Sequence, residues 1–218
     1  MNLLRCYILA GMLIGFSLEN PLKRVEPWIR PCAGSMPVGV HFHTRIDINV
    51  NDVILRLTRK VELFLQKLDQ TFLYLNDGLL NDVDLTNTLN GQPTIDGYPS
   101  NCVESQTPDS TVQKDNYLKI SKLYIFMDHF KTFDIDGTLR DLSHGLVSSL
   151  NDILCEFTLL VNTTGYQPIN ELNRNIIREE YKSFTVSKFY SWDYILLRDT
   201  KIFGRSILNM VKNSRFSR

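Results

Sequence analysis

Histidine and aspartate residues are the side chains in this sequence whose spacing first suggests chemistry. His41 and His43 form a His-x-His pair, but the other histidines are His129 and His144, and no Cys-x-x-Cys motif accompanies them. Zinc sites take three or four such ligands, so surface histidines are the better interpretation. Asp134–Gly137 resembles the opening of a calcium loop but lacks the third acidic ligand and the closing glutamate. A turn whose aspartate caps the next helix explains this motif, and no metal site is predicted.

The motifs of the common enzyme classes are missing as well. The sequence contains no Gly-x-Ser-x-Gly elbow, no glycine loop that would cradle a phosphate and no Gly-x-Gly-x-x-Gly. Its 24 Lys and Arg residues balance 24 Asp and Glu residues, which removes the usual electrostatic reason to expect a nucleic acid or an anionic membrane as partner. We therefore expect a protein that is no enzyme, needs no cofactor, binds no nucleic acid and works through its surface.

The first residues have the pattern of a secretory signal peptide. Met1–Arg5 carries one positive side chain, and Cys6–Leu18 is uncharged and apolar. This stretch is shorter than the roughly 20 residues of a membrane-spanning helix. Gly15 and Ser17 suit cleavage after Ser17. We predict a signal peptide over residues 1–17 and a secreted, extracellular chain over 18–218 that inserts into no membrane; a buried amino-terminal helix or an uncleaved anchor is the alternative.

Secretion favours a disulfide, and the positions of the cysteines limit the choice. Cys6 would leave with the signal peptide, so three cysteines remain and at most one bridge can form within the chain. Cys155 lies in an apolar helical pattern and is expected to be a buried thiol. Cys32 and Cys102 both lie in irregular sequence that contains proline. We therefore predict a bridge between Cys32 and Cys102.

The sequon Asn162-Thr163-Thr164 follows one of the apolar helical patterns. Its middle residue is permitted, and Gly165 directly after it indicates a loop. In a secreted chain Asn162 is therefore a candidate glycosylation site.

Four amphipathic patterns with three- and four-residue spacing indicate four long helices, at about 50–76, 110–133, 137–161 and 183–212. Asn49 or Asn51 would cap the first helix, and Gly78 would end it in the left-handed conformation. No alternating run of strand length competes with them, so the sequence predicts an all-α protein. The apolar stripes include Leu57, Val61, Phe64 and Leu68; Tyr117, Ile120, Leu123 and Met127; Leu146, Leu150 and Ile153; and Leu196, Phe203 and Ile207.

The lengths of the connections predict the topology. About four residues separate the second and third helices, so these should be antiparallel neighbours. The first and third connections, at roughly 30 and 20 residues, are long enough to run the length of a helix. The first of them, 78–109, is polar and shows no helical period, so we expect an irregular loop there. A long, short, long order is that of a long-chain four-helix bundle with up-up-down-down topology and two long crossover loops.

Several stretches resemble the interleukin-6-type cytokines, and within them the group of ciliary neurotrophic factor and cardiotrophin-like cytokine. Thr58–Leu73 is similar to the first helix of cardiotrophin-like cytokine without a gap, and Leu139–Tyr166 is similar to its third helix. Phe203–Leu208, with its Arg-Ser pair, is similar to the close of the fourth helix across the group. Leu85–Pro93 is similar to a loop of ciliary neurotrophic factor.

The resemblance implies a secreted ligand that assembles class I cytokine receptors at the cell surface and activates JAK-STAT signalling. The receptors would be the shared signal transducer of the family and a chain like the leukaemia-inhibitory-factor receptor, with an alpha receptor as an optional third. A soluble receptor-like chain that accompanies secretion is a further partner compatible with the resemblance.

The resemblance also implies a receptor site at the amino end of the fourth helix, where the family carries a Phe-x-x-Lys motif. In this sequence Phe184 and Lys188 stand one residue further apart, and an ungapped count back from the Arg-Ser pair lands near Phe189. An aromatic side chain beside a cation suits a binding hot spot. Phe184 packed within a loop is the competing interpretation.

Two more sites are implied by the resemblance. The shared signal transducer would bind the first and third helices, where Arg59, Glu62, Gln66 and Arg140 qualify by position; a solvated helix face is the alternative for each. An alpha receptor would bind the end of the fourth helix together with the first long loop, where Arg205 matches the family. Its alternative is a surface cation near a helix carboxyl end, where the helix dipole favours positive charge.

Two other functions stay open from the sequence. One is a secreted helical carrier that binds a lipid or another apolar ligand in an internal cavity. The other is a helical cytokine of a different branch, which would select different receptor chains.

Overall fold

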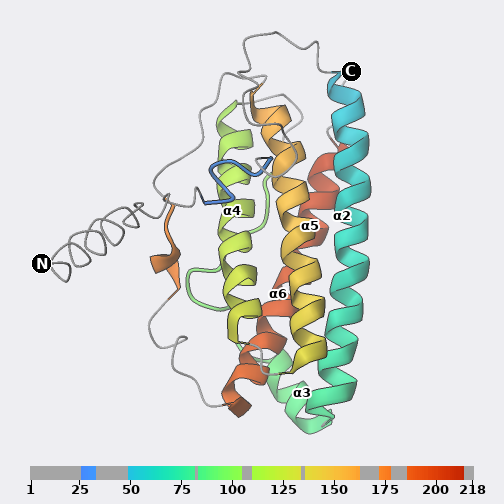
Figure 1. The fold of residues 1–218 in the computed structure, drawn as a ribbon, viewed down its shortest axis with the longest axis vertical. Coiled ribbons are helices and arrows are strands. Elements are labelled where there is room, and N and C mark those ends of the chain that lie inside the picture. Colours follow the sequence, from blue (N-terminus) through green and yellow to red (C-terminus); the bar gives the residue numbers. More distant parts are fainter. Residues whose placement is uncertain are drawn as a thin grey trace, which may run out of the picture.

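A computed structural model describes residues 26–32, 49–81, 83–104, 110–133, 136–162, 172–177 and 186–213. These residues contain five α-helices and no strand, which confirms the predicted all-α class (Figure 1). Every described helix is too short or too polar to pass through a lipid bilayer. The predicted signal peptide, residues 1–17, lies outside the described residues. The helices are α2 (Val50–Leu73), α3 (Val83–Asn90), α4 (Ser110–Phe133), α5 (Gly137–Asn162) and α6 (Val186–Asn213).

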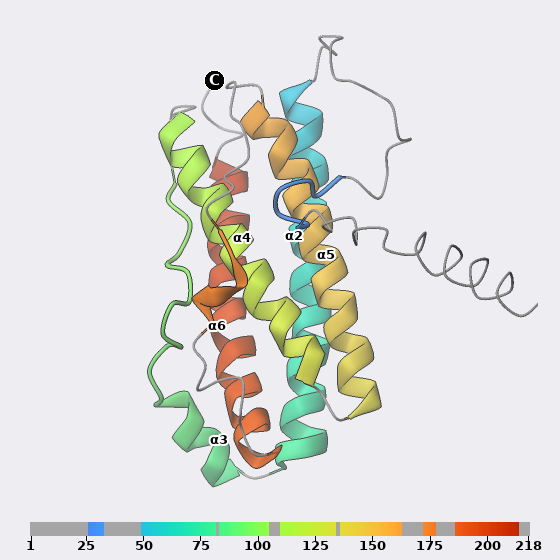
Figure 2. The ribbon, with the colours of Figure 1, turned by 60° about the vertical axis from the view of Figure 1, so that its left-hand side comes forward.

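The four long helices pack around a shared apolar core. Both α5 and α6 pack against α2, and α4 packs against α5 and α6. Arg56 and Lys67 of α2 pair with Glu156 and Ser149 of α5, so residue numbers rise along one helix as they fall along the other. Figures 1 and 2 show that α2 and α4 run in one direction while α5 and α6 run in the opposite direction.

Helix α2 forms where the sequence pattern predicts it. The Asn49 side chain accepts the Asn51 N–H at 3.0 Å, so Asn49 and not Asn51 is the cap. The predicted ending at Gly78 is wrong. The α-helix passes at Tyr74 into a π-helical segment, Tyr74–Leu80, and Asn81 takes the left-handed conformation with φ at 38°. Asparagine is the residue other than glycine that adopts this conformation most readily.

Helix α3 lies inside the segment that was expected to be an irregular loop. Its carboxyl end is held by Arg198 of α6, whose Nη1 donates to the carbonyl oxygens of Leu89, Asn90 and Gln92 at 2.9, 3.1 and 2.9 Å. A guanidinium at this position satisfies carbonyls that a helix end leaves without partners. This short helix is therefore held by the contact of Arg198 as well as by Leu85 and Leu89, which pack against the core.

Helix α4 is buried on almost every side. The predicted stripe of Tyr117, Ile120, Leu123 and Met127 is buried, but burial continues round the helix, through Ile125 and its neighbours. Such a helix needs cover on faces that the other helices leave open. Three irregular segments supply it: 95–98, 172–177 and 26–32.

The first of these segments places Tyr98 against both α4 and α6. The Tyr98 ring lies 5.5 Å from the Phe126 ring of α4 and 6.4 Å from the Phe203 ring of α6, measured between centroids. Its hydroxyl lies 3.1 Å from Thr200 Oγ1. Beside it, Gly97 has φ at +80°, and a Cβ there would come within 3.2 Å of the Ile176 carbonyl oxygen. Glycine at this position therefore allows the two long connections to touch.

The predicted Cys32–Cys102 bridge is wrong. Cys32 bonds to Cys155, with 5.0 Å between their Cα atoms. The reason is the position of residues 26–32, which lie along α4 and α5 and place Cys32 beside α5. There the Trp28 carbonyl accepts the Tyr117 hydroxyl at 2.6 Å, and Trp28 itself is 1% exposed.

Cys102 is a buried free thiol, the role that had been expected for Cys155. Its N–H donates to the Ser206 hydroxyl of α6 at 3.0 Å, on a different side of the molecule from Cys155. Burial raises the pKa of the Cys102 thiol to about 12, although the hydrogen bond with Ser206 opposes the rise. The side chain therefore behaves as a small apolar group.

Candidate functional site

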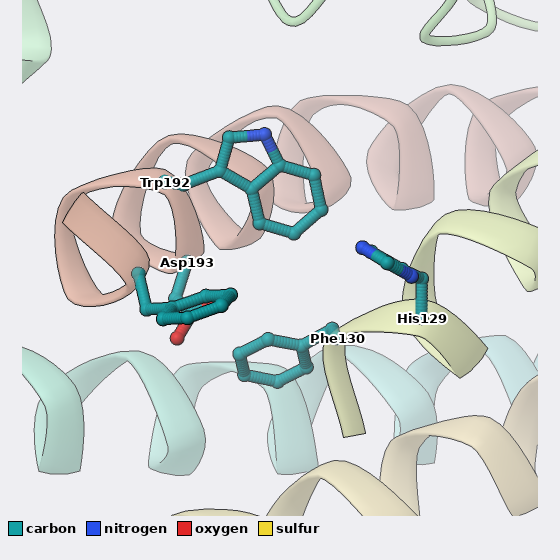
Figure 3. A pocket seen from close by; sticks show the side chains of 5 residues that line it. His129, Phe130, Trp192 and Asp193 are labelled. Atoms are coloured by element: carbon teal, nitrogen blue, oxygen red, sulfur yellow. The ribbon is translucent and has the colours of Figure 1, made fainter. Parts of the chain in front are cut away.

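A small hollow lies between the amino end of α6 and the carboxyl end of α4 (Figure 3). His129 and Phe130 of α4 line it together with Phe189, Trp192 and Asp193 of α6. The His129 ring meets the Trp192 ring edge-on, with centroids 5.8 Å apart and an interplanar angle of 82°. The space suits about one water molecule, so this hollow could not hold a lipid chain.

The lining of this hollow is mainly aromatic. Three aromatic side chains form its walls, and His129 and Asp193 add one nitrogen base and one carboxylate. Aromatic side chains in well-packed positions dominate the binding energy of protein interfaces. Trp192 is 6% exposed, which leaves Phe189 and His129 as the half-buried groups that a partner could touch.

The structure separates the residues predicted for this end of the bundle. Lys188 is exposed at the first turn of α6, whereas Phe189, one position later, turns into the hollow. Phe184 lies outside the described residues, so its pairing with Lys188 stays a prediction. From the sequence, none of His129, Trp192 and Asp193 was assigned to a site. That a histidine of α4 lies beside the start of α6 follows only from how the two helices pack, which the sequence pattern does not show.

A second surface runs along the outward face of α2. Arg59 and Gln66 are exposed there, as predicted from position. Three leucines share this face: Leu55, Leu63 and Leu73 are 40%, 55% and 57% exposed. The sequence pattern could have shown them, because they fall opposite the buried stripe. Aliphatic side chains exposed singly in this way are ordinary on a protein surface and do not by themselves mark a contact area.

Glu62 and Arg140 do not join this face. Glu62 lies at its edge toward α6 and forms an ion pair with Lys212 at 3.0 Å. Arg140 is exposed in the first turn of α5, next to Asp136, which accepts the Tyr74 hydroxyl at the far end of α2. Fifteen residues separate Tyr74 from Arg59, a rise of about 22 Å along a helix. Arg59 and Arg140 therefore lie far apart along the bundle.

The other cations on α2 have structural partners. Glu156 of α5 is 7% exposed and receives Arg56 at 3.1 Å and Lys60 at 3.0 Å. A buried carboxylate needs such partners, since an unpaired charge in the interior is costly. Arg59 lies outside this cluster on the exposed face.

Arg205 is exposed in the second half of α6. The next residue, Ser206, accepts the Cys102 N–H, so the first long connection passes beside this part of α6. This proximity is what the resemblance implied for an alpha-receptor site. Asn162 is the last residue of α5, and its glycosylation stays a prediction.

Comparison with known proteins adds no relative: no family model, no curated protein and no solved structure matches this chain.

Proposed function

We propose that this protein is a secreted helical cytokine of the interleukin-6 type, which assembles class I cytokine receptors at the cell surface. Its fold would be the long-chain four-helix bundle with up-up-down-down topology and two crossover loops. The observation that carries the proposal is the direction of the helices: α2 and α4 run one way, and α5 and α6 run the other. Two connections that return the full length of the bundle are then required, which is the cytokine arrangement.

The surface supports the same function. A ligand that brings receptors together needs several separate contact areas, and three are available: the hollow beside Phe189, the outward face of α2 around Gln66, and the exposed part of α6 around Arg205. The hollow lies at the amino end of α6, whereas the other two areas lie on adjacent helices, because Gly204 packs against Leu65. A receptor chain at the hollow would leave the surface around Gln66 and Arg205 open.

Secretion is part of the proposal. A disulfide between Cys32 and Cys155 is compatible with an oxidising compartment, where such bonds persist. The apolar stretch Cys6–Leu18 would direct export.

The test is receptor capture from living cells. The purified chain would be incubated with cells that carry the shared signal transducer, cross-linked and recovered, and the bound proteins identified by mass spectrometry. We expect class I cytokine receptors in the recovered material and STAT tyrosine phosphorylation in the cells. Absence of both would overturn the proposal, and a copurified lipid in native mass spectrometry would favour the carrier instead.

A double variant locates the receptor site within this experiment. Phe184→Ala with Lys188→Ala should abolish STAT phosphorylation while an alpha receptor is still captured. Full STAT activation by this variant would move the signalling site away from the amino end of α6.

A further inference from the structure

Residues 26–32 form what we name the amino-terminal clasp. It is fixed covalently at one end by the bond from Cys32 to Cys155 of α5. Between its ends, the Asn151 side chain donates to the Pro31 carbonyl at 3.0 Å, and Tyr117 donates to the Trp28 carbonyl. The Trp28 ring packs against Tyr124 of α4 with centroids 6.0 Å apart. The clasp is thus a strip of chain laid over the apolar circumference of α4.

Arg174 joins the clasp to the second long connection. Its guanidinium forms ion pairs with Glu26 of the clasp, at 3.2 Å, and with Asp128 of α4. It also lies over the Trp28 ring, with its Cζ atom 5.5 Å from the centroid. Lys131 adds a second cation to Asp128. One arginine on residues 172–177 therefore contacts the clasp and α4 at the same time.

We propose that the Cys32–Cys155 bridge is a redox-controlled lock, which keeps the amino-terminal clasp seated and, through Arg174, keeps residues 172–177 against α4. Apart from this bond, the clasp is held by non-covalent contacts. Trp28 is 1% exposed, packs against Tyr124 and lies under the Arg174 guanidinium, and Ile29 packs against the core. The hydrogen bonds from Tyr117 and Asn151 and the Glu26–Arg174 ion pair add to this packing. Cys32 and Cys155 are both half-buried, so the bond is within reach of a reductant at the surface. Once it opens, the clasp is held by reversible contacts alone.

The chemistry of opening is thiol–disulfide exchange with a dithiol. One thiolate of the dithiol attacks a sulfur of the bridge, the Cys32–Cys155 bond breaks and a mixed disulfide forms. The second thiol of the reagent then closes a ring disulfide and releases the other cysteine. Two electrons pass to the protein, both cysteine sulfurs end as thiols after taking up two protons, and the dithiol is oxidised to its cyclic disulfide.

The lock has a consequence for signalling that rests on the proposed function. Asp128 directly precedes His129 and Phe130, which line the hollow at the amino end of α6, and α6 begins nine residues after Ile177. Release of Arg174 would therefore loosen two segments that lead to the proposed receptor site. The direct packing of α2 against α5 and α6 does not involve the clasp or Arg174, so these three helices should keep their protection.

Hydrogen–deuterium exchange on the isolated protein tests the lock without any receptor. The folded, oxidised chain is compared with the same chain after treatment with dithiothreitol, which avoids a variant that fails to fold. We expect exchange in 26–32 and in 172–177 to rise at least tenfold after reduction, while the middle turns of α2, α5 and α6 keep their protection. Unchanged exchange in either segment, or equal loss of protection throughout, would overturn the proposal.

Variants separate the two parts of the lock. Arg174→Met keeps the bridge. This variant should raise exchange in residues 172–177, whereas exchange in residues 26–32 should rise less, because Cys32 is still bonded to Cys155. Cys32→Ser with Cys155→Ser should reproduce the reduced state and make dithiothreitol ineffective. Cys102→Ala, which leaves the bridge intact, is the matched control and must respond to dithiothreitol as the parent does. Because exchange is read on the free protein, failure of the lock is distinguishable from failure of receptor capture.

Discussion

Gly204 of α6 lies against Leu65 of α2: a Cβ placed on Gly204 would be 2.8 Å from Leu65 Cδ2 and 3.5 Å from Phe64 Cε1. The two helices approach closely here because the glycine has no side chain. The same glycine weakens the helix it belongs to, since glycine disfavours helix interiors by about 1 kcal/mol relative to alanine. Packing and helix propensity therefore oppose each other at this position.

This opposition predicts different results for two glycine-to-alanine variants. Gly145→Ala in α5 has nothing within 4 Å of the new Cβ, so it should raise the free energy of unfolding by roughly 0.5–1 kcal/mol. Gly204→Ala should fail to show this gain, because Leu65 must move. Gly204→Leu should cost about 1–3 kcal/mol through overpacking. Urea denaturation followed by circular dichroism measures all three, and an equal gain for both alanine variants would contradict the close packing.

Arg205 provides a test of the alpha-receptor surface. Its side chain is exposed, so Arg205→Glu should leave the circular dichroism spectrum and the urea midpoint unchanged. Because a charged partner would then be repelled, affinity for a captured alpha receptor should fall at least tenfold, about 1.4 kcal/mol. Lys114→Glu makes the same charge change at an exposed position on α4 and is the matched control. Equal affinity of the two variants in a binding titration would remove Arg205 from the site.

The lowered pKa of the Asp128 carboxyl predicts how the free energy of unfolding depends on pH. Burial alone would raise the pKa of this carboxyl, but hydrogen bonds and charge from Lys131 and Arg174 outweigh burial and lower it. A folded-state pKa below the unfolded value, about 3.9, contributes stability that is present above that value. This stability is lost as the pH falls through the lower folded-state pKa.

The free energy of unfolding should therefore fall as the pH is lowered below about 4. Asp128→Asn should weaken stability at neutral pH and flatten this acid limb, whereas Asp152→Asn, exposed on α5, should keep the profile of the parent. Urea titrations at a series of pH values give the comparison. An acid limb that is the same in all three proteins would show that Asp128 is not its source.

The thiol of Cys102 should be unreactive in the folded protein. Burial raises its pKa to about 12, so at pH 8 very little thiolate is present and access is blocked. Maleimide labelling should be slow in the native state and fast in urea. A non-reducing peptide map should in addition recover Cys32 and Cys155 in one linked peptide. Rapid native labelling of Cys102, or a link that includes it, would contradict the described fold.

Local signals in the sequence were sufficient for the long helices. Asn49 caps α2, and the Asp136 side chain accepts the Leu139 N–H at 2.8 Å, so the motif that looked like a calcium loop is a helix cap in the structure. Both features depend on residues within a few positions of each other. The buried stripe of α2 follows from the same short-range periodicity.

Features that depend on distant contacts could not be predicted in this way. The partner of Cys32 is set by where an irregular segment with no periodicity lies on α4 and α5, and helix α3 depends on a guanidinium more than 100 residues away in the chain. The hollow at the start of α6 needs His129 and Trp192 to meet across two helices. Neither residue type nor spacing along one element carries such information.

The segments that cover α4 limit which connections can be deleted from this protein. In most helical proteins a surface connection can be shortened at little cost. Here deletion of residues 95–98 would remove the Tyr98 ring, which contacts both α4 and α6, and its hydroxyl, which lies beside Thr200. A minimal protein built from the long helices and short linkers would expose the apolar side chains of α4 to water. Such a protein would aggregate instead of folding.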